Sequence, residues 1–270
     1  MLVDYHLHLR DQDERIDHTA AAAERFVERA HERGVDEIGF TEHVYYFRQT
    51  AEIWSVPYQT ERCVYDLDAY VDAVVEAKRR GLPVKLGLEV DYVGERQGRL
   101  SEILQPYPWD YLLGSVHWID GLAIDQEPGI WARGVEDVWR AYFDALAELS
   151  GSGAVDVLAH PDLAKIFGER PADGALHALH ERAAEAIANA DVSIEISTAG
   201  LRKPVGELYP DPSLLRACST RGVPITLASD GHVPALVGED FDQALELAAS
   251  AGYESVSMFQ GRKRRQEPLG

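Results

Sequence analysis

The stretch Val3-Asp4-Tyr5-His6-Leu7-His8-Leu9 is a β-like, mostly apolar run that carries two histidines near its end. The pair His6-x-His8 has a period of two, so within a strand both imidazoles lie on the same side and can reach one metal ion. Later apolar runs also end on metal-binding residue types, namely His43, Glu89, His117, His160, Glu195, and Asp230 with His232. Six of the ten histidines lie at such ends. This pattern predicts a site for several metal ions on the rim of a barrel.

Seven apolar runs are predicted as strands, at residues 2–9, 37–41, 84–90, 111–116, 155–159, 192–196 and 224–228. Helical patterns lie between them. Residues 69–80 show the type well, because Val71 and Val74 share one face and Gly81 and Pro83 then end the helix. The alternation predicts a β-α series with a mostly parallel sheet.

Such a series either closes into a barrel or forms an open doubly wound sheet. In an open sheet, ligands gather where the strand order reverses, whereas in a barrel all the carboxyl ends of the strands surround one basin. Ligand-type side chains at seven strand ends require the second geometry, so we predict a barrel. A further short strand at residues 255–259 is expected to close the sheet. We expect one domain over residues 1–270, since single α/β barrels commonly have this length.

The composition argues against several classes of protein. A formal net charge of −20 disfavours nucleic-acid binding, because the overall field repels DNA and RNA. No apolar run reaches the roughly 18 residues of a membrane span, and the first residues enter a predicted strand without a signal peptide. The two cysteines are too few for a disulfide framework. We therefore expect a soluble cytoplasmic protein with no membrane or nucleic-acid partner, of undetermined oligomeric state.

Three long irregular stretches follow strand ends, at residues 44–66, 119–135 and 200–212, so all three should lie over the same rim. Their aromatic residues are expected either to wall a small-molecule pocket or to pack the loops onto the barrel; these are Tyr45, Tyr46, Phe47, Trp54, Tyr58 and Trp131. Arg202 and Lys203 follow the strand that ends at Glu195, and a guanidinium can bind phosphate through two hydrogen bonds. In such an acidic chain, this pair favours a small phosphorylated substrate.

The ligand types also indicate which metals to expect. Mixed imidazole and carboxylate ligands suit zinc, iron or manganese better than calcium or magnesium. One catalytic zinc ion typically takes about three protein ligands. The predicted set exceeds that number, so two or three divalent ions are expected. Paired ions can stabilise both the attacking and the leaving oxygen of a phosphoryl displacement.

Several motifs resemble, in order and over nearly the whole chain, those of the polymerase-and-histidinol-phosphatase (PHP) superfamily. They are His6-x-His8, Thr41-Glu42-His43, Gly87-Leu88-Glu89, Gly114-Ser115-Val116-His117, His160-Pro161 and Ser229-Asp230-x-His232. Residues 114–121 and 200–210 are also similar to segments of the stand-alone histidinol-phosphate phosphatases. The resemblance implies a distorted (β/α)7 TIM-like barrel, the PHP fold, with up to three divalent ions.

Carried over by motif, the resemblance implies three groups of metal ligands. The first ion would be held by His6, His8, Glu89 and Asp230. A second ion would share Glu89 and be held by His117 and His160. A third would be held by His43, His232 and one residue of the first loop. That residue is Glu14 by spacing, which we prefer, or His18 if the loop carries an insertion.

The resemblance implies hydrolysis of L-histidinol phosphate to L-histidinol and phosphate in histidine biosynthesis. The expected catalytic residues are Asp230, His232 and Glu89, with Asp230 or His232 assisting the leaving alkoxide. Residues expected to contact the substrate are Arg202, Lys203, Glu195 and, for its ammonium group, Asp120 or Glu207. Two other functions stay open. One is a phosphoesterase of the same superfamily acting on nucleotides or oligonucleotides, and the other is a non-catalytic, metal-binding regulatory module.

Overall fold

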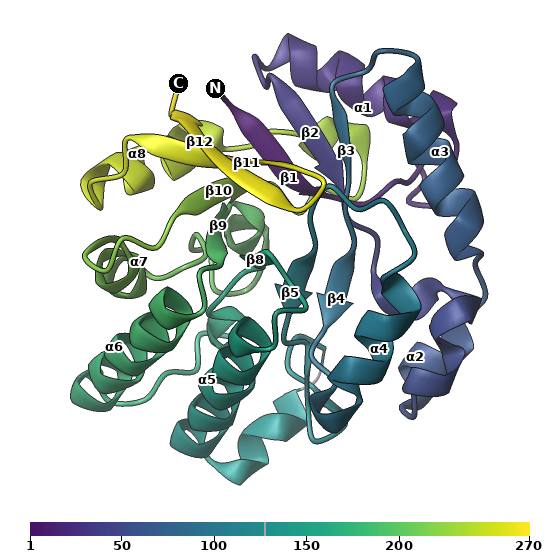
Figure 1. Ribbon diagram of the computed structural model, residues 1–270. Helices are drawn as coiled ribbons and strands as arrows, with labels where there is room; N and C mark the ends of the chain where they lie inside the picture. Colours follow the sequence, from purple (N-terminus) through teal and green to yellow (C-terminus); the bar gives the residue numbers. More distant parts are fainter. Residues whose placement is uncertain (127) are drawn as a thin grey trace.

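Parallel strands surrounded by helices form the centre of the computed structural model, which describes residues 1–126 and 128–270 (Figure 1). The strands of the barrel are β1 (Val3–Leu7), β2 (Glu37–Phe40), β3 (Val84–Leu86), β4 (Glu89–Asp91), β5 (Leu113–Ser115), β8 (Val157–Leu158), β9 (Ser193–Ser197) and β10 (Ile225–Ala228). They form a three-stranded sheet, β1-β2-β3, and a five-stranded sheet, β10-β9-β8-β5-β4. Parallel bridges between Leu7 and Gly231 and between His43 and Glu89 join the two sheets. The strands therefore close on themselves.

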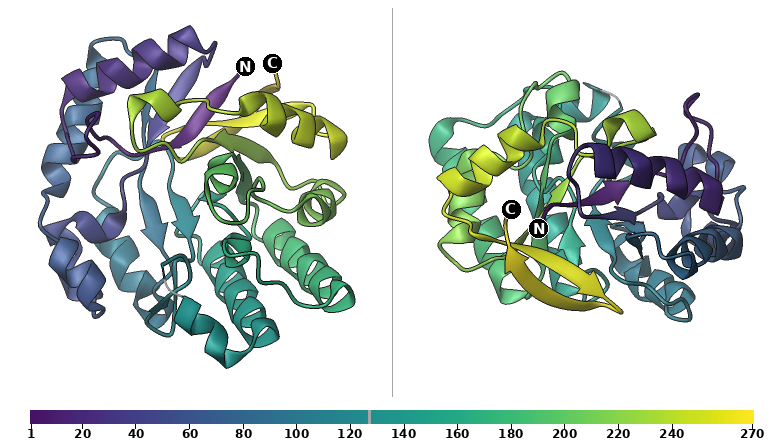
Figure 2. Two further views of the ribbon diagram at one scale, coloured as in Figure 1. Left: turned by 180° about the vertical axis from the view of Figure 1, so that it is seen from behind. Right: turned by 90° about the horizontal axis from the view of Figure 1, so that it is seen from above.

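Each strand position of the barrel is followed by a helix before the next one begins. These helices are α1 (Ala20–Glu32), α3 (Leu67–Arg79), α4 (Gln97–Leu104), α5 (Val135–Gly151), α6 (Asp173–Asn189), α7 (Pro212–Ser219) and α8 (Phe241–Ser250), with the short α2 (Pro57–Arg62) ahead of α3. They lie on the outside of the barrel in all three views (Figures 1 and 2). The predicted distorted (β/α)7 barrel is thereby confirmed. Among the described residues, no helix combines the length and the hydrophobicity that a membrane-spanning segment requires.

The distortion comes from the third strand position. The run predicted as one strand at residues 84–90 is divided, with β3 paired to β2 and β4 paired to β5. The chain changes sheet at Gly87, where space is very limited: a Cβ atom there would lie 2.8 Å from Thr41 and 2.8 Å from Tyr111. Tyr70 on α3 also donates its hydroxyl to the Gly87 carbonyl, at 2.9 Å. The break delivers Glu89 to the middle of the carboxyl end of the barrel.

Helix α3 shows how the sequence sets the limits of a helix. Asp66 is its N-cap and accepts a hydrogen bond from the backbone N–H of Asp68, at 3.0 Å, which satisfies a donor that the helix cannot. Lys78 and Arg79 lie in the last turn, where cations interact favourably with the helix dipole. Gly81 then has a φ of +85°, a conformation that favours glycine and ends the helix.

The last predicted strand does not close the barrel, which corrects the expectation for residues 255–259. Strand β11 (Ser255–Gln260) instead pairs antiparallel with β12 (Lys263–Pro268), giving a hairpin that lies across the amino ends of the strands (Figure 1). Phe259 stacks on Tyr111, with ring centroids 5.6 Å apart, and the backbone N–H of Arg262 donates to the Asp110 carbonyl at 2.8 Å. The hairpin therefore covers the end of the barrel opposite to the predicted site.

Candidate metal centre

Histidines and carboxylates from six of the seven strand positions meet at the carboxyl ends of the strands. His6 and His8 come from the end of β1, His43 follows β2, Glu89 begins β4, His117 follows β5, His160 follows β8, and Asp230 with His232 follow β10. Four overlapping groups have ligand atoms within 4.8 Å of one another: His6-His8-Asp230, His6-Glu89-His160, His43-Glu89-His117 and His8-His43-His232. The structure thus brings eight residues that the sequence marked as ligands into one cluster.

Glu89 lies at the centre of this cluster and is fully buried. Its Oε1 atom lies 3.2 Å from His160 Nε2 and 3.4 Å from His117 Nε2, and it accepts a hydrogen bond from the Ser115 hydroxyl at 2.7 Å. Its Oε2 atom lies 2.6 Å from His43 Nδ1. Because both carboxylate oxygens face different histidines, one side chain can serve two neighbouring ion sites.

The residues present fit divalent metal ions. His6 Nε2 and His8 Nε2 are buried atoms with no hydrogen-bond partner among the described residues. Buried polar atoms are normally paired, and those left unpaired in a native structure call for a missing ligand or ion. Imidazole nitrogens and carboxylate oxygens pointing at one another supply the donor set that zinc, manganese and iron prefer. The cluster would therefore hold such ions.

A second layer of carboxylates lies behind three of these histidines. Glu195 contacts His6 Nδ1 at 3.0 Å, Asp91 contacts His117 Nδ1 at 2.8 Å, and Glu42 lies 3.6 Å from His8 Nδ1. A carboxylate on one ring nitrogen fixes the ring orientation and makes the other nitrogen a better ligand. Asp91 and Glu42 were not assigned from sequence, although Asp91 follows Glu89 with the same period of two as His6 and His8.

Glu195 is one residue whose expected role the structure corrects. We expected it to contact the substrate, but it is fully buried, and its second oxygen accepts the backbone N–H of His160 at 2.7 Å. The backbone of His160 has a φ of +27°, which is unusual for a residue other than glycine. Glu195 therefore lies beneath the cluster and holds His6 and the strained backbone of His160 in place.

Opposite charges dominate the electrostatics of the cluster. Burial alone would raise the pKa of Glu89, but the surrounding histidines hold it well below its usual range. The pKa of Asp230 is held well below its usual range in the same way. Burial would lower the pKa of His117, yet Glu89, Asp91 and, more weakly, Asp125 raise it to about 10. The carboxylates are thus ionised at neutral pH, which is the form that binds cations.

A pocket of about 210 Å³ opens above the cluster. Ligand residues form its floor, and its walls include Tyr45, Tyr46, Tyr58, Trp118 and Tyr209. Of the aromatic residues singled out in the sequence, three line this pocket, whereas Phe47, Trp54 and Trp131 do not appear in its lining. Three charged side chains outside the cluster also line it: Arg10, Lys203 and Asp125. The pocket is therefore polar and small.

One of the two predicted cationic contacts is arranged differently from the expectation. Lys203 lines the pocket, but Arg202 donates hydrogen bonds to the Ser229 carbonyl at 2.5 Å and to Glu239 at 3.3 Å, and so ties down the segment that carries Asp230. The guanidinium that does line the pocket belongs to Arg10, which donates to the Tyr46 hydroxyl at 3.0 Å. Arg10 continues the 6, 8, 10 alternation of the first strand, a signal that could have identified it.

The structure also corrects the expectations for Glu14 and Asp120. Glu14 is exposed in a turn of the first loop, whereas His18 lies against Glu42, with 3.8 Å between His18 Nε2 and Glu42 Oε1. Of the two candidates for the third ion site, His18 is thus the one near the cluster. Asp120 is exposed and paired with Arg133 at 2.7 Å, outside the pocket. Glu207 pairs with Arg170. The acidic residue that lines the pocket is Asp125.

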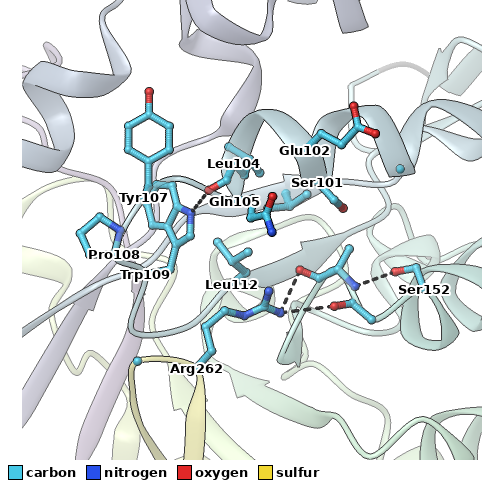
Figure 3. Close-up of a pocket in the computed structure, with 15 residues that line it drawn as sticks. Ser101, Glu102, Leu104, Gln105, Tyr107, Pro108, Trp109, Leu112, Ser152 and Arg262 are labelled. Atoms are coloured by element: carbon cyan, nitrogen blue, oxygen red, sulfur yellow. Dashed lines mark hydrogen bonds between the residues drawn. The ribbon is translucent and has the colours of Figure 1, made fainter.

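A larger cavity lies elsewhere and has a volume of about 660 Å³. It is formed by α4, the segment before β5, the end of α5 and the tip of the β11–β12 hairpin (Figure 3). Trp109 Nε1 donates to the Leu104 carbonyl at 2.8 Å, and Arg262 donates to the Ala154 carbonyl at 3.1 Å. These polar groups already have partners within the protein, so this cavity offers none of the chemistry of the rim.

An α/β barrel with seven strand positions and with buried histidines and carboxylates at the carboxyl ends of its strands defines a class of metal-dependent barrel proteins. Within this class, the model of the PHP domain matches residues 4–199, and the chain belongs to the PHP family. The chain is 31% identical over 254 residues to a probable histidinol-phosphatase of Deinococcus radiodurans, covering 93% of this chain and 94% of that relative.

Two solved structures share the fold. The putative histidinol phosphatase of Listeria monocytogenes superposes with a TM-score of 0.75 at 21% identity, covering 89% of this chain and 99% of the other. The histidinol phosphate phosphatase of Lactococcus lactis, solved with zinc, L-histidinol and phosphate, superposes with a TM-score of 0.74 at 20% identity, covering 98% of both chains. The whole (β/α)7 architecture is therefore common to the three proteins.

Proposed function

We propose that the chain is a metal-dependent phosphomonoesterase that hydrolyses L-histidinol phosphate to L-histidinol and phosphate. The observation that carries this proposal is the cluster of eight ligand residues beneath a small pocket that also presents two cations. The relative at 31% identity is named as a probable histidinol-phosphatase, which supports the choice of substrate. The pocket volume of about 210 Å³ lies below the range of roughly 300–1,000 Å³ common for larger ligands, which favours a small phosphomonoester over a nucleotide.

Two or three divalent ions, of zinc, manganese or iron, are proposed as cofactors. His6, His8, Glu89 and Asp230 would hold one, Glu89, His117 and His160 a second, and His43 and His232 a third. His18, which lies against Glu42, is the nearer of the two first-loop candidates for that third ion. Bound ions would act as Lewis acids that activate water and neutralise charge on the phosphoryl group. Zinc in the Lactococcus lactis structure supports the first of the three metals.

The protein's own side chains would bind and orient the substrate. We propose that Arg10 and Lys203 bind the phosphate oxygens, because both are cations that line the pocket beside the cluster. Asp230 and His232 line the same pocket and are proposed to carry protons to and from the reacting oxygens. Tyr45, Tyr46 and Tyr58 narrow the pocket and would exclude bulk water around the substrate. A single domain over residues 1–270 and a cytoplasmic location belong to the same proposal.

The test is phosphate release from L-histidinol phosphate by protein whose metal content has been measured. Nucleoside monophosphates and a short oligonucleotide serve as competing substrates. We expect turnover of L-histidinol phosphate to exceed that of every nucleotide. Much faster turnover of nucleotides would overturn the biosynthetic assignment, and metal-loaded protein without activity on any phosphoester would support a non-catalytic metal-binding module.

A further inference from the structure

Asp125 is a charged residue of the pocket that belongs to none of the candidate groups of metal ligands. It lines the pocket, and its Oδ1 atom is buried without a hydrogen-bond partner among the described residues. It also forms none of the ion pairs found within the described part of the chain. A buried carboxylate oxygen with no partner is unfavourable unless a ligand or water supplies a donor. Its position in the pocket makes a ligand the natural source of that donor.

Local structure fixes Asp125 beside the metal cluster. After β5, the chain forms a small antiparallel hairpin of β6 (Trp118–Ile119) and β7 (Leu122–Ala123). The next residue, Ile124, is fully buried and donates its backbone N–H to the His117 carbonyl at 2.9 Å. This hydrogen bond holds Ile124 next to His117, and the following residue, Asp125, therefore lies at the pocket. Trp118 of the same hairpin has a second buried, unpartnered atom, its Nε1 donor.

The charges of the pocket lie on different sides of the barrel. Arg10 follows β1 and Lys203 follows β9, so the two cations flank the position of β10, which lies between these strands. Asp125 follows β5, which lies across the barrel from the seam between β10 and β1. A ligand held by its phosphate near the two cations would therefore place a neighbouring cationic group toward Asp125.

We propose that Asp125 binds the ammonium group of an aminoalkyl phosphate and makes the pocket selective for phosphomonoesters that carry a positive charge close to the phosphate. This inference rests on the proposed phosphatase activity and adds a residue that sets its specificity. An ammonium group offers three N–H donors, and a charge-assisted hydrogen bond to a carboxylate is about twice as strong as a neutral one. Removing the carboxylate charge should therefore cost affinity only for substrates that have the amine.

The experiment compares Asp125→Asn with the wild-type protein, both loaded with metal and of measured metal content. The substrates are L-histidinol phosphate and its analogue without the amine, 3-(imidazol-4-yl)propyl phosphate. We expect kcat/KM for L-histidinol phosphate to fall by about 10- to 100-fold, and kcat/KM for the analogue to change by less than about 3-fold. The inhibition constant of L-histidinol should rise, while that of inorganic phosphate stays the same.

Asp120→Asn is the matched control, because Asp120 belongs to the same β6–β7 hairpin but is exposed and paired with Arg133. It should behave as the wild type on both substrates. Equal losses on both substrates in Asp125→Asn, or loss of bound metal, would overturn the proposal, since Asp125 would then act on the reaction or the ions in general. If the wild type does not hydrolyse L-histidinol phosphate, the proposed function fails. The Asp125 proposal is then decided by whether the variant loses any preference for 2-aminoethyl phosphate over ethyl phosphate.

Discussion

Asp91 is a fully buried residue that acts, in this structure, through His117. Its Oδ1 atom lies 2.8 Å from His117 Nδ1, which leaves His117 Nε2 facing Glu89. Replacing Asp91 with asparagine keeps the shape but removes the charge. We expect metal affinity to fall about 10- to 100-fold, with the fold retained. Competition with a chelating dye would measure this, and the exposed Asp72→Asn variant is the control. Unchanged metal affinity in Asp91→Asn would contradict the orienting role.

The pKa of His117 leads to a prediction about protons. In the metal-free protein, the adjoining carboxylates raise this pKa to about 10, so the imidazole is protonated at pH 7. The resulting stabilisation is fully present below the unfolded-state value of about 6.5 and is lost as the pH rises through the folded-state value. Metal ligands must be deprotonated, so ion binding should release protons and should tighten as the pH rises. Metal titration in weakly buffered solution with an indicator dye would detect them. Uptake without proton release would argue against His117 as a ligand.

At the scale of residues, the convergence of most candidate metal ligands could be predicted, as could Lys203 in the pocket lining, whereas Asp125 could not. His6, His8, Glu89 and Asp230 lie at the ends of strands, and the geometry of a parallel barrel brings such ends together whatever the loops do. Asp125 is placed by the pairing of β6 with β7 and by the bond from Ile124 to His117. Neither contact follows from a periodic pattern, so sequence alone pointed to Asp120 or Glu207 instead.

The β11–β12 hairpin is the element whose place the sequence predicted wrongly. Its first strand was recognised from its composition, but composition does not determine a pairing partner. The charged residues 262–265 lie in this hairpin, where Arg262 pairs with Asp156 at 2.9 Å and Arg264 pairs with Asp191. Both acidic residues precede barrel strands, so the hairpin fastens the amino ends of β8 and β9.

We expect the β11–β12 hairpin to contribute to the stability of the fold and not to catalysis. Phe259 is 2% exposed and packs on Tyr111 and Tyr5. Phe259→Ala should lower the free energy of unfolding by about 3–5 kcal/mol, the usual range for a buried phenylalanine, as measured by urea unfolding. The folded variant should keep the wild-type kcat/KM, because the pocket lies at the other end of the strands. Gln260→Ala, at an exposed position, should change stability by less than about 0.5 kcal/mol. Loss of activity in folded Phe259→Ala would show that the two ends are coupled.

For the whole molecule, the metal cluster links ion binding to folding. The ligands come from six of the seven strand positions, so bound ions would connect nearly the entire barrel. Because the unfolded chain lacks this arrangement, bound ions stabilise the native state by mass action. We expect chelation to abolish phosphatase activity and lower the Tm, and added zinc or manganese to restore both. A Tm that does not depend on metal concentration would contradict this prediction.

The arrangement of charge around the pocket has a consequence for the handedness of the substrate. Arg10 and Lys203 follow β1 and β9, whereas Asp125 follows β5 and Tyr45 follows β2, and all four residues line the pocket. A molecule held at three separate places by three different groups cannot be exchanged for its mirror image without breaking one contact. The phosphate, the ammonium and the imidazole ring of histidinol phosphate surround a single stereocentre in this way. The pocket would therefore distinguish the two enantiomers of the substrate as well as its functional groups. We expect it to reject the D enantiomer.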